Sequence, residues 1–301
     1  MLNPAATISR IAIAAFACSS LATAQTSSKA ARESLLKADR ALSSDASQRG
    51  ITVAFENAAA QDALFLYDGA PIVAGHDNVV ALLAAQPELK VNRIQWLPLV
   101  VTVSADGLVG ATWGAVSVRP PQSDSARFGK YISTWRQSPN GEWKLTAFVE
   151  MGLSEQKVVL PDSLPKSFVS SKNPTIGPGA PFAKADLDFS KMAGSKGAPT
   201  AFAAFAAPNA MTLPGTGEIV VGPPAIHARM LESPAAKAKW AWHPVYSESS
   251  TSGDLGFTVG EAVIAIPGAN GVNNFTSKYL TVWRRQADGA IRFIVDGGNG
   301  R

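Results

Sequence analysis

The sequence predicts a segregated α+β fold that occurs twice along the chain. In each half, alanine-rich helical stretches come first, and strands rich in β-branched and aromatic residues follow. The second half also repeats residues of the first in the same order. Hydrophobic residues make up 46% of the chain and charged residues 17%. That composition supplies enough apolar surface for packed cores and argues against general disorder.

The internal repeat is clearest where residues 130–136, Lys-Tyr-Ile-Ser-Thr-Trp-Arg, match residues 278–284, Lys-Tyr-Leu-Thr-Val-Trp-Arg. Other matches pair Asp39 with Asp186, and Trp96 with Trp242, at nearly the same spacing. A constant spacing along the whole chain indicates a duplicated domain. The predicted boundaries are 28–152 for the first copy, 182–301 for the second, and 153–181 for a linker rich in proline, serine and glycine.

Each copy is expected to order its elements in the same way. In the first copy we expect helices over 28–60 with a break near Gly50, a hairpin at 63–74, a helix opening at His76, and strands at 94–104, 108–118, 130–137 and 143–150. In the second copy the helices run over 182–207 with a break near Gly197, and the next helix opens at Pro223. Helices should therefore cover one face of an antiparallel sheet.

The first 24 residues predict export. Arg10 precedes an apolar run over 11–18, and small residues end at Ala22-Thr23-Ala24. This order is typical of a secretory signal peptide, so cleavage is expected after Ala24 and the protein in the periplasm. The apolar run is too short for a membrane span. Cys18, the only cysteine, lies inside it, so the mature chain is expected to have none.

Charge and motifs exclude several functions. Lysine and arginine are scattered and the net charge is only +4, which argues against nucleic-acid binding. The three histidines lack zinc-site spacing and no cysteine complements them, so no metal is expected. The sequence has no nucleophile elbow, dinucleotide-binding glycine motif or Walker motif, which predicts no nucleotide cofactor and no serine hydrolase.

Two strand segments of the second copy resemble a known family. Residues 253–260, Gly-Asp-Leu-Gly-Phe-Thr-Val-Gly, and residues 278–285 are similar to strands of the SnoaL-like branch of the nuclear transport factor 2-like superfamily, also described as domain of unknown function 4440. The first copy is less similar, because 107–110 lacks the aspartate. The resemblance covers nearly all of the mature chain outside the linker. It implies two cone-shaped domains, each a curved sheet around helices with a pocket inside, that pair through their sheets. The superfamily includes isomerases, cyclases, dehydratases and transport adaptors, so the fold does not select a function.

Aromatic side chains on the strands are the candidate ligand-binding residues. Rings with polar tips can enclose an apolar ligand and orient it by hydrogen bonds. The alternative is that these rings only fill the core of a small domain. The predicted set comprises Trp113, Tyr131 and Trp135 in the first copy, and Trp242, Phe257, Tyr279 and Trp283 in the second.

Glu261 is the candidate catalytic residue. It shares a strand face with Phe257 and Val259, and the first copy has Ala115 in its place. A carboxylate on an apolar face would have a raised pKa and could act as an acid or base. If that face points outwards, Glu261 is an ordinary solvated residue, and Asp296 on the last strand poses the same alternatives. For Asp39 and Asp186 we expect hydrogen bonds to nearby backbone or a place on the helix surface.

The sequence thus favours an exported, non-catalytic protein that binds a small apolar or aromatic molecule. One alternative is an isomerase- or cyclase-type enzyme with a pocket carboxylate, and a second is a protein-interaction scaffold. The two copies are expected to pack against each other within one chain, which would make the protein a monomer.

Overall fold

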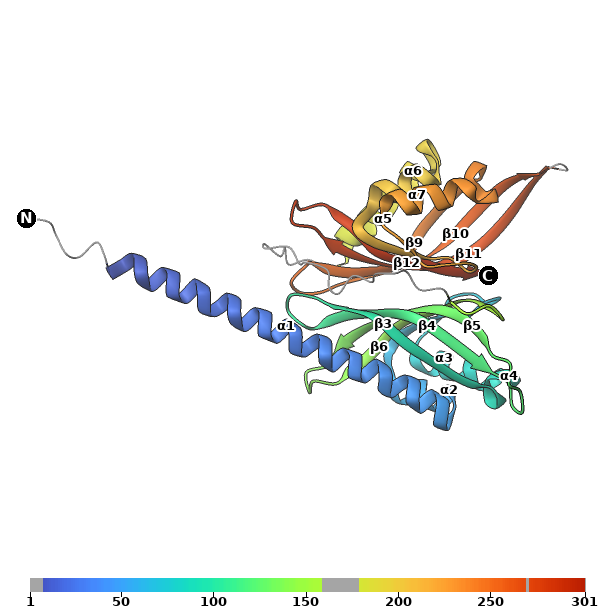
Figure 1. The fold of residues 1–301 in the computed structure, drawn as a ribbon, viewed down its shortest axis with the longest axis horizontal. Coiled ribbons are helices and arrows are strands. Elements are labelled where there is room, and N and C mark those ends of the chain that lie inside the picture. Colours follow the sequence, from blue (N-terminus) through green and yellow to red (C-terminus); the bar gives the residue numbers. More distant parts are fainter. Residues whose placement is uncertain (1–7, 159–178, 269–270, 301) are drawn as a thin grey trace, which may run out of the picture.

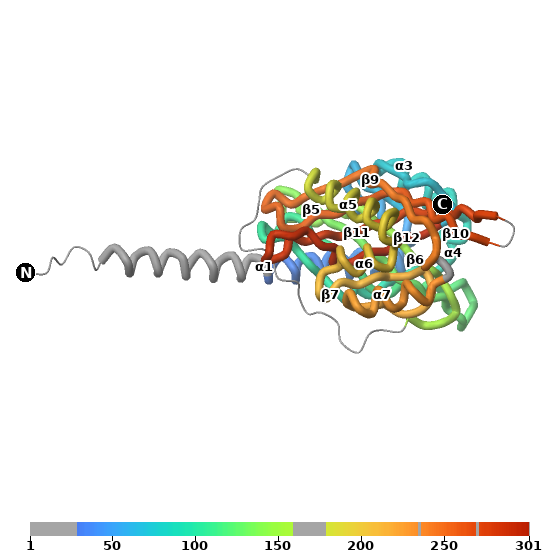
Figure 2. Tube along the Cα trace, turned by 90° about the horizontal axis from the view of Figure 1, so that it is seen from above, coloured from blue at the N-terminus to red at the C-terminus, as the bar shows by residue number. Residues whose placement is uncertain are grey.

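Two six-stranded sheets pack against each other in the centre of the molecule, and their helices lie on the outer sides (Figure 1). This computed structural model describes residues 8–158, 179–268 and 271–300. Seen from above, the second copy lies over the first (Figure 2). The predicted α+β fold, with helices on each of two sheets, is confirmed.

The first copy runs from helices to strands. Its helices are α1 (Ile8–Arg49), α2 (Ile51–Ala58), α3 (His76–Ala85) and α4 (Pro87–Val91). Its strands are β1 (Ala59–Leu66), β2 (Val73–Ala74), β3 (Arg93–Val103), β4 (Val109–Arg119), β5 (Arg127–Gln137) and β6 (Trp143–Ser154), in the spatial order β2-β1-β6-β5-β4-β3.

The second copy has the same strand order, β8-β7-β12-β11-β10-β9. Its helices are α5 (Ala180–Lys196), α6 (Ala198–Phe205), α7 (Pro223–Glu232) and a 3-10 helix, η2 (Pro234–Lys237). Its strands are β7 (Ala206–Leu213), β8 (Val220–Val221), β9 (Lys239–Ser249), β10 (Leu255–Gly268), β11 (Gly271–Arg285) and β12 (Ile291–Gly300).

Described elements overlap both ends of the predicted linker. Strand β6 continues to Ser154, and α5 begins at Ala180, inside the predicted linker over 153–181. Residues 159–178 of that linker lie outside the described residues, as do residues 1–7 of the predicted signal peptide. Cleavage after Ala24 therefore stays a prediction. No helix among the described residues is both long enough and apolar enough to cross a membrane.

Glycine sets the helical break in both copies. Gly50 has a φ of 94° and Gly197 a φ of 86°, a left-handed region that glycine adopts without a steric cost. The chain leaves α1 or α5 there and starts the next helix one residue later. The breaks near these two residues are where the sequence predicts them.

The sheets are not purely antiparallel as predicted. Strand β1 pairs in parallel with β6, and β7 pairs in parallel with β12. In each copy the first strand runs in the same direction as the last strand and pairs with it. The rest of the copy connects the two strands. Such a pairing joins residues far apart in the sequence, so local patterns do not reveal it. It brings Thr212 beside Asp296 in the second copy.

A buried carboxylate joins the helices to the sheet in both copies. Trp96 Nε1–H donates to Oδ1 of Asp39 over 2.7 Å, and the Tyr131 hydroxyl donates to Oδ2 over 2.7 Å. In the second copy Asp186 accepts the corresponding bonds from Trp242, 2.7 Å, and Tyr279, 2.8 Å. The expectation of backbone partners or a surface position for these aspartates is thus wrong. Both aspartates are buried on the helix face that packs on the sheet, and side chains of the strands donate to them.

Removing one of these hydrogen bonds should lower stability measurably. We expect Tyr131→Phe to lower the free energy of unfolding by about 2 kcal/mol, because a hydrogen bond to a buried carboxylate is lost. Tyr67→Phe is the matched control: its hydroxyl donates to Glu88 at the surface, and its loss should change stability by about 0.5 kcal/mol or less. Urea unfolding compares the two. Equal losses would show that the bond to Asp39 adds little.

Polar contacts cross between the two sheets at several points. The Trp113 Nε1–H donates to the Met211 sulfur over 3.1 Å, and Lys130 Nζ donates to the Pro214 carbonyl over 2.8 Å. Asn299 Nδ2 donates to the carbonyls of Leu66 and Glu150. In the central part of each sheet, one face is consequently covered by helices and the other by the second sheet.

Candidate functional site

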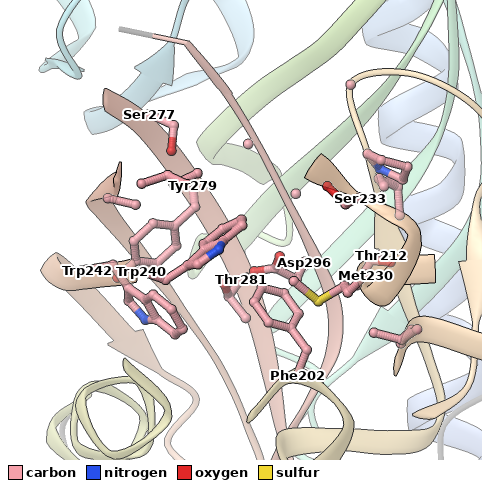
Figure 3. A pocket seen from close by; sticks show the side chains of 18 of the residues that line it. Phe202, Thr212, Met230, Ser233, Trp240, Trp242, Ser277, Tyr279, Thr281 and Asp296 are labelled. Atoms are coloured by element: carbon pink, nitrogen blue, oxygen red, sulfur yellow. Dashed lines mark hydrogen bonds between the residues drawn. The ribbon is translucent and has the colours of Figure 1, made fainter. Parts of the chain in front are cut away.

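A cavity of about 440 Å³ opens inside the second copy, between its helices and its curved sheet (Figure 3). Most of its wall is apolar, and its aromatic part comes from α5, α6, β9 and β11. The apolar residues include Phe189, Phe202, Ile226, Met230, Trp240, Trp242, Ala262, Ile264, Ile266 and Phe275. The polar side chains that line it are Thr212, Thr216, Arg229, Ser233, Ser277, Lys278, Tyr279, Thr281 and Asp296.

Asp296 is the polar centre of this cavity. Figure 3 shows it beside Thr281, between the two tryptophans and Met230. The Thr281 hydroxyl donates to Asp296 Oδ2 over 2.5 Å. Burial raises the pKa of Asp296 to about 7; the hydrogen bond from Thr281 opposes this rise and the nearby Asp186 carboxyl adds to it. Near neutral pH the Asp296 carboxyl can therefore both accept a hydrogen bond and, when protonated, donate one.

Two substitutions between the copies change the chemistry of the cavity wall. In the first copy Phe65 on β1 pairs with Phe148 on β6, and their rings stack with centroids 5.6 Å apart. The corresponding pair on β7 and β12 is Thr212 and Asp296. Two aromatic rings are thus replaced by two small polar side chains at one place in the fold. The space that aromatic rings fill in the first copy is open in the second.

The first copy has a cavity of different chemistry. It measures about 470 Å³ and has Phe65 and Phe148 in its wall. Ser133, the counterpart of Thr281, does not line it, and the ring of Phe148 stands in its wall where Asp296 stands in the second copy. Four charged residues line it, of which three are acidic: Asp68, Glu88, Arg127 and Glu150.

Among the predicted ligand-binding residues, the structure brings Trp242 and Tyr279 to the cavity. Both are held in place by Asp186. Trp283 lies deeper in the core, where its Nε1–H donates to the Thr258 hydroxyl over 2.8 Å and its ring packs on Phe189.

In the first copy, Tyr131 and Trp135 are also core residues. Tyr131 is bonded to Asp39, and the Trp135 Nε1–H donates to Ser133 over 2.9 Å. Neither lines the first-copy cavity. These two rings therefore fill the core, which is the alternative that the sequence left open for them.

Phe257 and Trp113 lie between the sheets instead of inside a cavity. Trp113 reaches Met211 of the opposite copy. A Cβ on Gly256, the neighbour of Phe257, would meet the ring of Phe182 on helix α5. Since side chains alternate along a strand, Phe257 points away from the helices, towards the first copy.

Glu261 does not line the cavity either. It shares the strand face of Phe257, whereas its neighbours on the cavity side, Ala262 and Ile264, are in the wall. It lies opposite Lys278 on β11 and His243 on β9. Phe257 and Val259, the apolar residues on the same face as Glu261, are buried by the sheet of the first copy. Their apolar character therefore does not identify the cavity face of β10. The inner carboxylate is Asp296, and the signal that finds it is the replacement of Phe148 and Phe65 when the copies are aligned.

Within the described part of the chain, no three side chains of the His, Cys, Asp or Glu type converge as metal ligands would. The carboxylates of Asp186 and Asp296 are instead engaged by hydroxyl and indole donors.

No family model and no curated protein matches this chain. Several solved structures match it. An NTF2-like protein with a cystatin-like fold from Novosphingobium aromaticivorans is 14% identical, with a TM-score of 0.34, over 40% of this chain and 79% of that one. A ketosteroid isomerase-like protein from Erwinia carotovora atroseptica is 16% identical, with a TM-score of 0.35, over 40% and 95%. An uncharacterised protein with a cystatin-like fold from Caulobacter vibrioides is 17% identical, with a TM-score of 0.33, over 41% and 89%.

Proposed function

We propose that the second copy binds a small, mostly apolar molecule that carries one hydrogen-bonding group for Asp296. The observation that carries this proposal is the replacement of the stacked pair Phe65 and Phe148 by Thr212 and Asp296. A core that only had to be stable would keep the rings, because filling a cavity with apolar side chains stabilises a protein. An open space with a single buried acid is instead the usual composition of a ligand site.

The wall and the acid have separate tasks in this proposal. Burial of an apolar ligand against Trp240, Trp242 and Phe202 contributes about 25 cal/mol per Å² of apolar surface removed from water. Asp296 orients the ligand, either by accepting from a hydroxyl or amide or, when protonated, by donating to a carbonyl. A neutral ligand is favoured, because placing a charge in an apolar cavity without a partner is costly.

Binding without turnover is favoured over an isomerase- or cyclase-type reaction. Asp296 is the only carboxylate in the cavity wall as far as the structure describes it. The Tyr279 hydroxyl already donates to Asp186, so it is not free to stabilise an oxyanion. The proposal also includes two predictions from the sequence. Export, expected from residues 1–24, would place the binding role outside the cytoplasm, and the binding domain would be the second of the two expected at 28–152 and 182–301.

Nile red, a neutral dye whose emission changes in apolar surroundings, tests the site directly. Thr212→Phe together with Asp296→Phe restores the side chains of the first copy. We expect it to weaken dye binding roughly tenfold or more, about 1.4 kcal/mol, because the two rings take up space in the cavity and its acid is lost. Dye titrations of the wild type and the double variant, with thermal melts to confirm folding, provide the measurement.

Glu261→Gln is the matched control for this experiment. It changes a carboxylate on the opposite face of β10, so dye affinity should stay at the wild-type value. Unchanged affinity in the folded double variant, or lost affinity in the Glu261 variant, would contradict the proposed site.

A further inference from the structure

We infer that the ligand is elongated and that its apolar tail leaves the cavity along the hairpin formed by β10 and β11. This inference rests on the proposed function of the second-copy cavity, and it concerns the part of the wall that continues outside the cone.

The hairpin carries the apolar wall of the cavity outwards. Ala262, Ile264 and Ile266 follow one another on the cavity face of β10, and all three are in the wall. Ile264 pairs with Phe275 on β11, which is also in the wall although 53% of its surface is exposed. Since the pairing of β10 with β11 continues to Gly268 and Gly271, this apolar row lies on ordered sheet. Figure 1 shows the hairpin extending beyond the rest of the second copy.

The first copy lacks this apolar extension. The pairing of β4 with β5 ends at Val118 and Arg127. Tyr131 and Tyr279 are equivalent residues of the two copies. Four residues before each tyrosine, towards the tip of the hairpin, the first copy has Arg127 and the second has Phe275. The copy whose cavity contains Asp296 is thus the one in which the hairpin is longer and a charged residue is replaced by an aromatic one.

An apolar tail fits this surface better than a short, compact ligand does. A molecule that ended inside the cavity would leave half of Phe275 and a smaller part of Ile266 in water, whereas a longer chain would cover them. Each methylene buried in this way contributes about 0.8 kcal/mol, which is a gain of about fourfold in affinity. Arg229 on α7 and Ser277 on β11 also line the cavity, so a polar group along the tail would find hydrogen-bonding partners there.

Displacement of Nile red by straight-chain primary alcohols tests the inference. In the wild type we expect affinity to rise about fourfold per methylene from about six carbons to about twelve. Ile266→Ser together with Phe275→Ser shortens the apolar row. It should lower the ratio of dodecanol to hexanol affinity roughly tenfold or more, because it removes contacts that only the longer chain makes.

Val263→Ser together with Val272→Ser is the matched control. Val263 lies between Ala262 and Ile264 on β10 and therefore points to the other face of the hairpin, and neither valine is in the cavity wall, although both are exposed. This control should keep the wild-type ratio. If the Ile266 and Phe275 variant does not fold, Phe275→Ser alone gives the same comparison with a smaller loss.

The outcomes separate this inference from the proposed function. If short alcohols displace the dye but affinity stops rising at the same chain length in every variant, the cavity binds ligands and the tail path is wrong. If no alcohol displaces the dye and the Thr212 and Asp296 double variant binds it normally, the proposed function itself fails. If light scattering shows a dimer that the Phe275 variant converts to a monomer, the hairpin is a surface for self-association and the inference is overturned.

Discussion

Replacing Asp296 with asparagine should raise the free energy of unfolding by about 2–4 kcal/mol at about pH 8 and leave it nearly unchanged at about pH 4. Burial raises the pKa of this carboxyl to about 7 in the folded protein, against about 3.9 in an unfolded chain. Between those two values the unfolded state has released the proton and the folded state has kept it. Stability from this group is therefore fully present at low pH and is lost as the pH rises to about 7. Asparagine keeps the shape, carries no charge and removes the loss.

Glu150 gives the matched variant for this experiment in the first copy. Burial raises its pKa to about 7 as well, with Arg127 opposing and Asp68 adding to the rise. Glu150→Gln should remove its own share of the pH dependence, and the double variant should be the least sensitive to pH. Urea unfolding at several pH values measures all four proteins. If the Asp296 variant and the wild type show the same slope of stability against pH, the Asp296 carboxyl of the wild type is hydrated as in water. The description of Asp296 as a buried acid would then be wrong.

Much of the architecture could be predicted because it depends on local signals. Alanine-rich segments, glycine breaks at Gly50 and Gly197, and alternating strands separated by turns each act over a few residues. The internal repeat added a second, independent estimate of every element. The parallel pairing of β1 with β6 had no such signal, because it joins strands separated by most of the copy.

The inner face of each strand could not be predicted for a physical reason. Alternation of apolar and polar side chains identifies a buried face only when the other face is wet. In this protein the other face of β10 packs on the first copy, so Phe257 and Val259 are as buried as the cavity-side residues. That is why Glu261 was expected in the pocket while Asp296 was left open.

A comparison of the copies resolves what single-strand patterns leave open. Asp39 and Asp186 are equivalent and make equivalent bonds, so they belong to the shared framework. Asp296 stands where the other copy has Phe148, and a framework role does not explain that difference. In a duplicated fold, the positions that differ in polarity at one structural site are therefore the better candidates for function.

Arg284 is expected to be the most sensitive position between the two copies. Its guanidinium is buried, and Nη1 donates to Asp254 over 3.1 Å. Nη2 crosses to the first copy, where the Thr102 hydroxyl accepts over 2.7 Å and the Val103 carbonyl over 2.8 Å. Burial lowers the pKa of Arg284 to about 10, with Asp254 opposing, so the side chain stays charged at neutral pH.

We expect Arg284→Met to lower the free energy of unfolding by about 3–5 kcal/mol, because it leaves the Asp254 carboxylate buried without its cation. Arg136→Met is the control at the equivalent position of the first copy. Arg136 is 39% exposed and pairs with Glu248 and Asp62, so its loss should cost about 1 kcal/mol or less.

Urea unfolding of both variants, and of Arg284→Met combined with Asp254→Leu, completes the comparison. The double variant should recover much of the loss, since removing both charges leaves no unpaired ion. Equal effects of the two arginines would show that the burial of the Arg284–Asp254 pair does not make it more sensitive than the half-exposed Arg136 pairs.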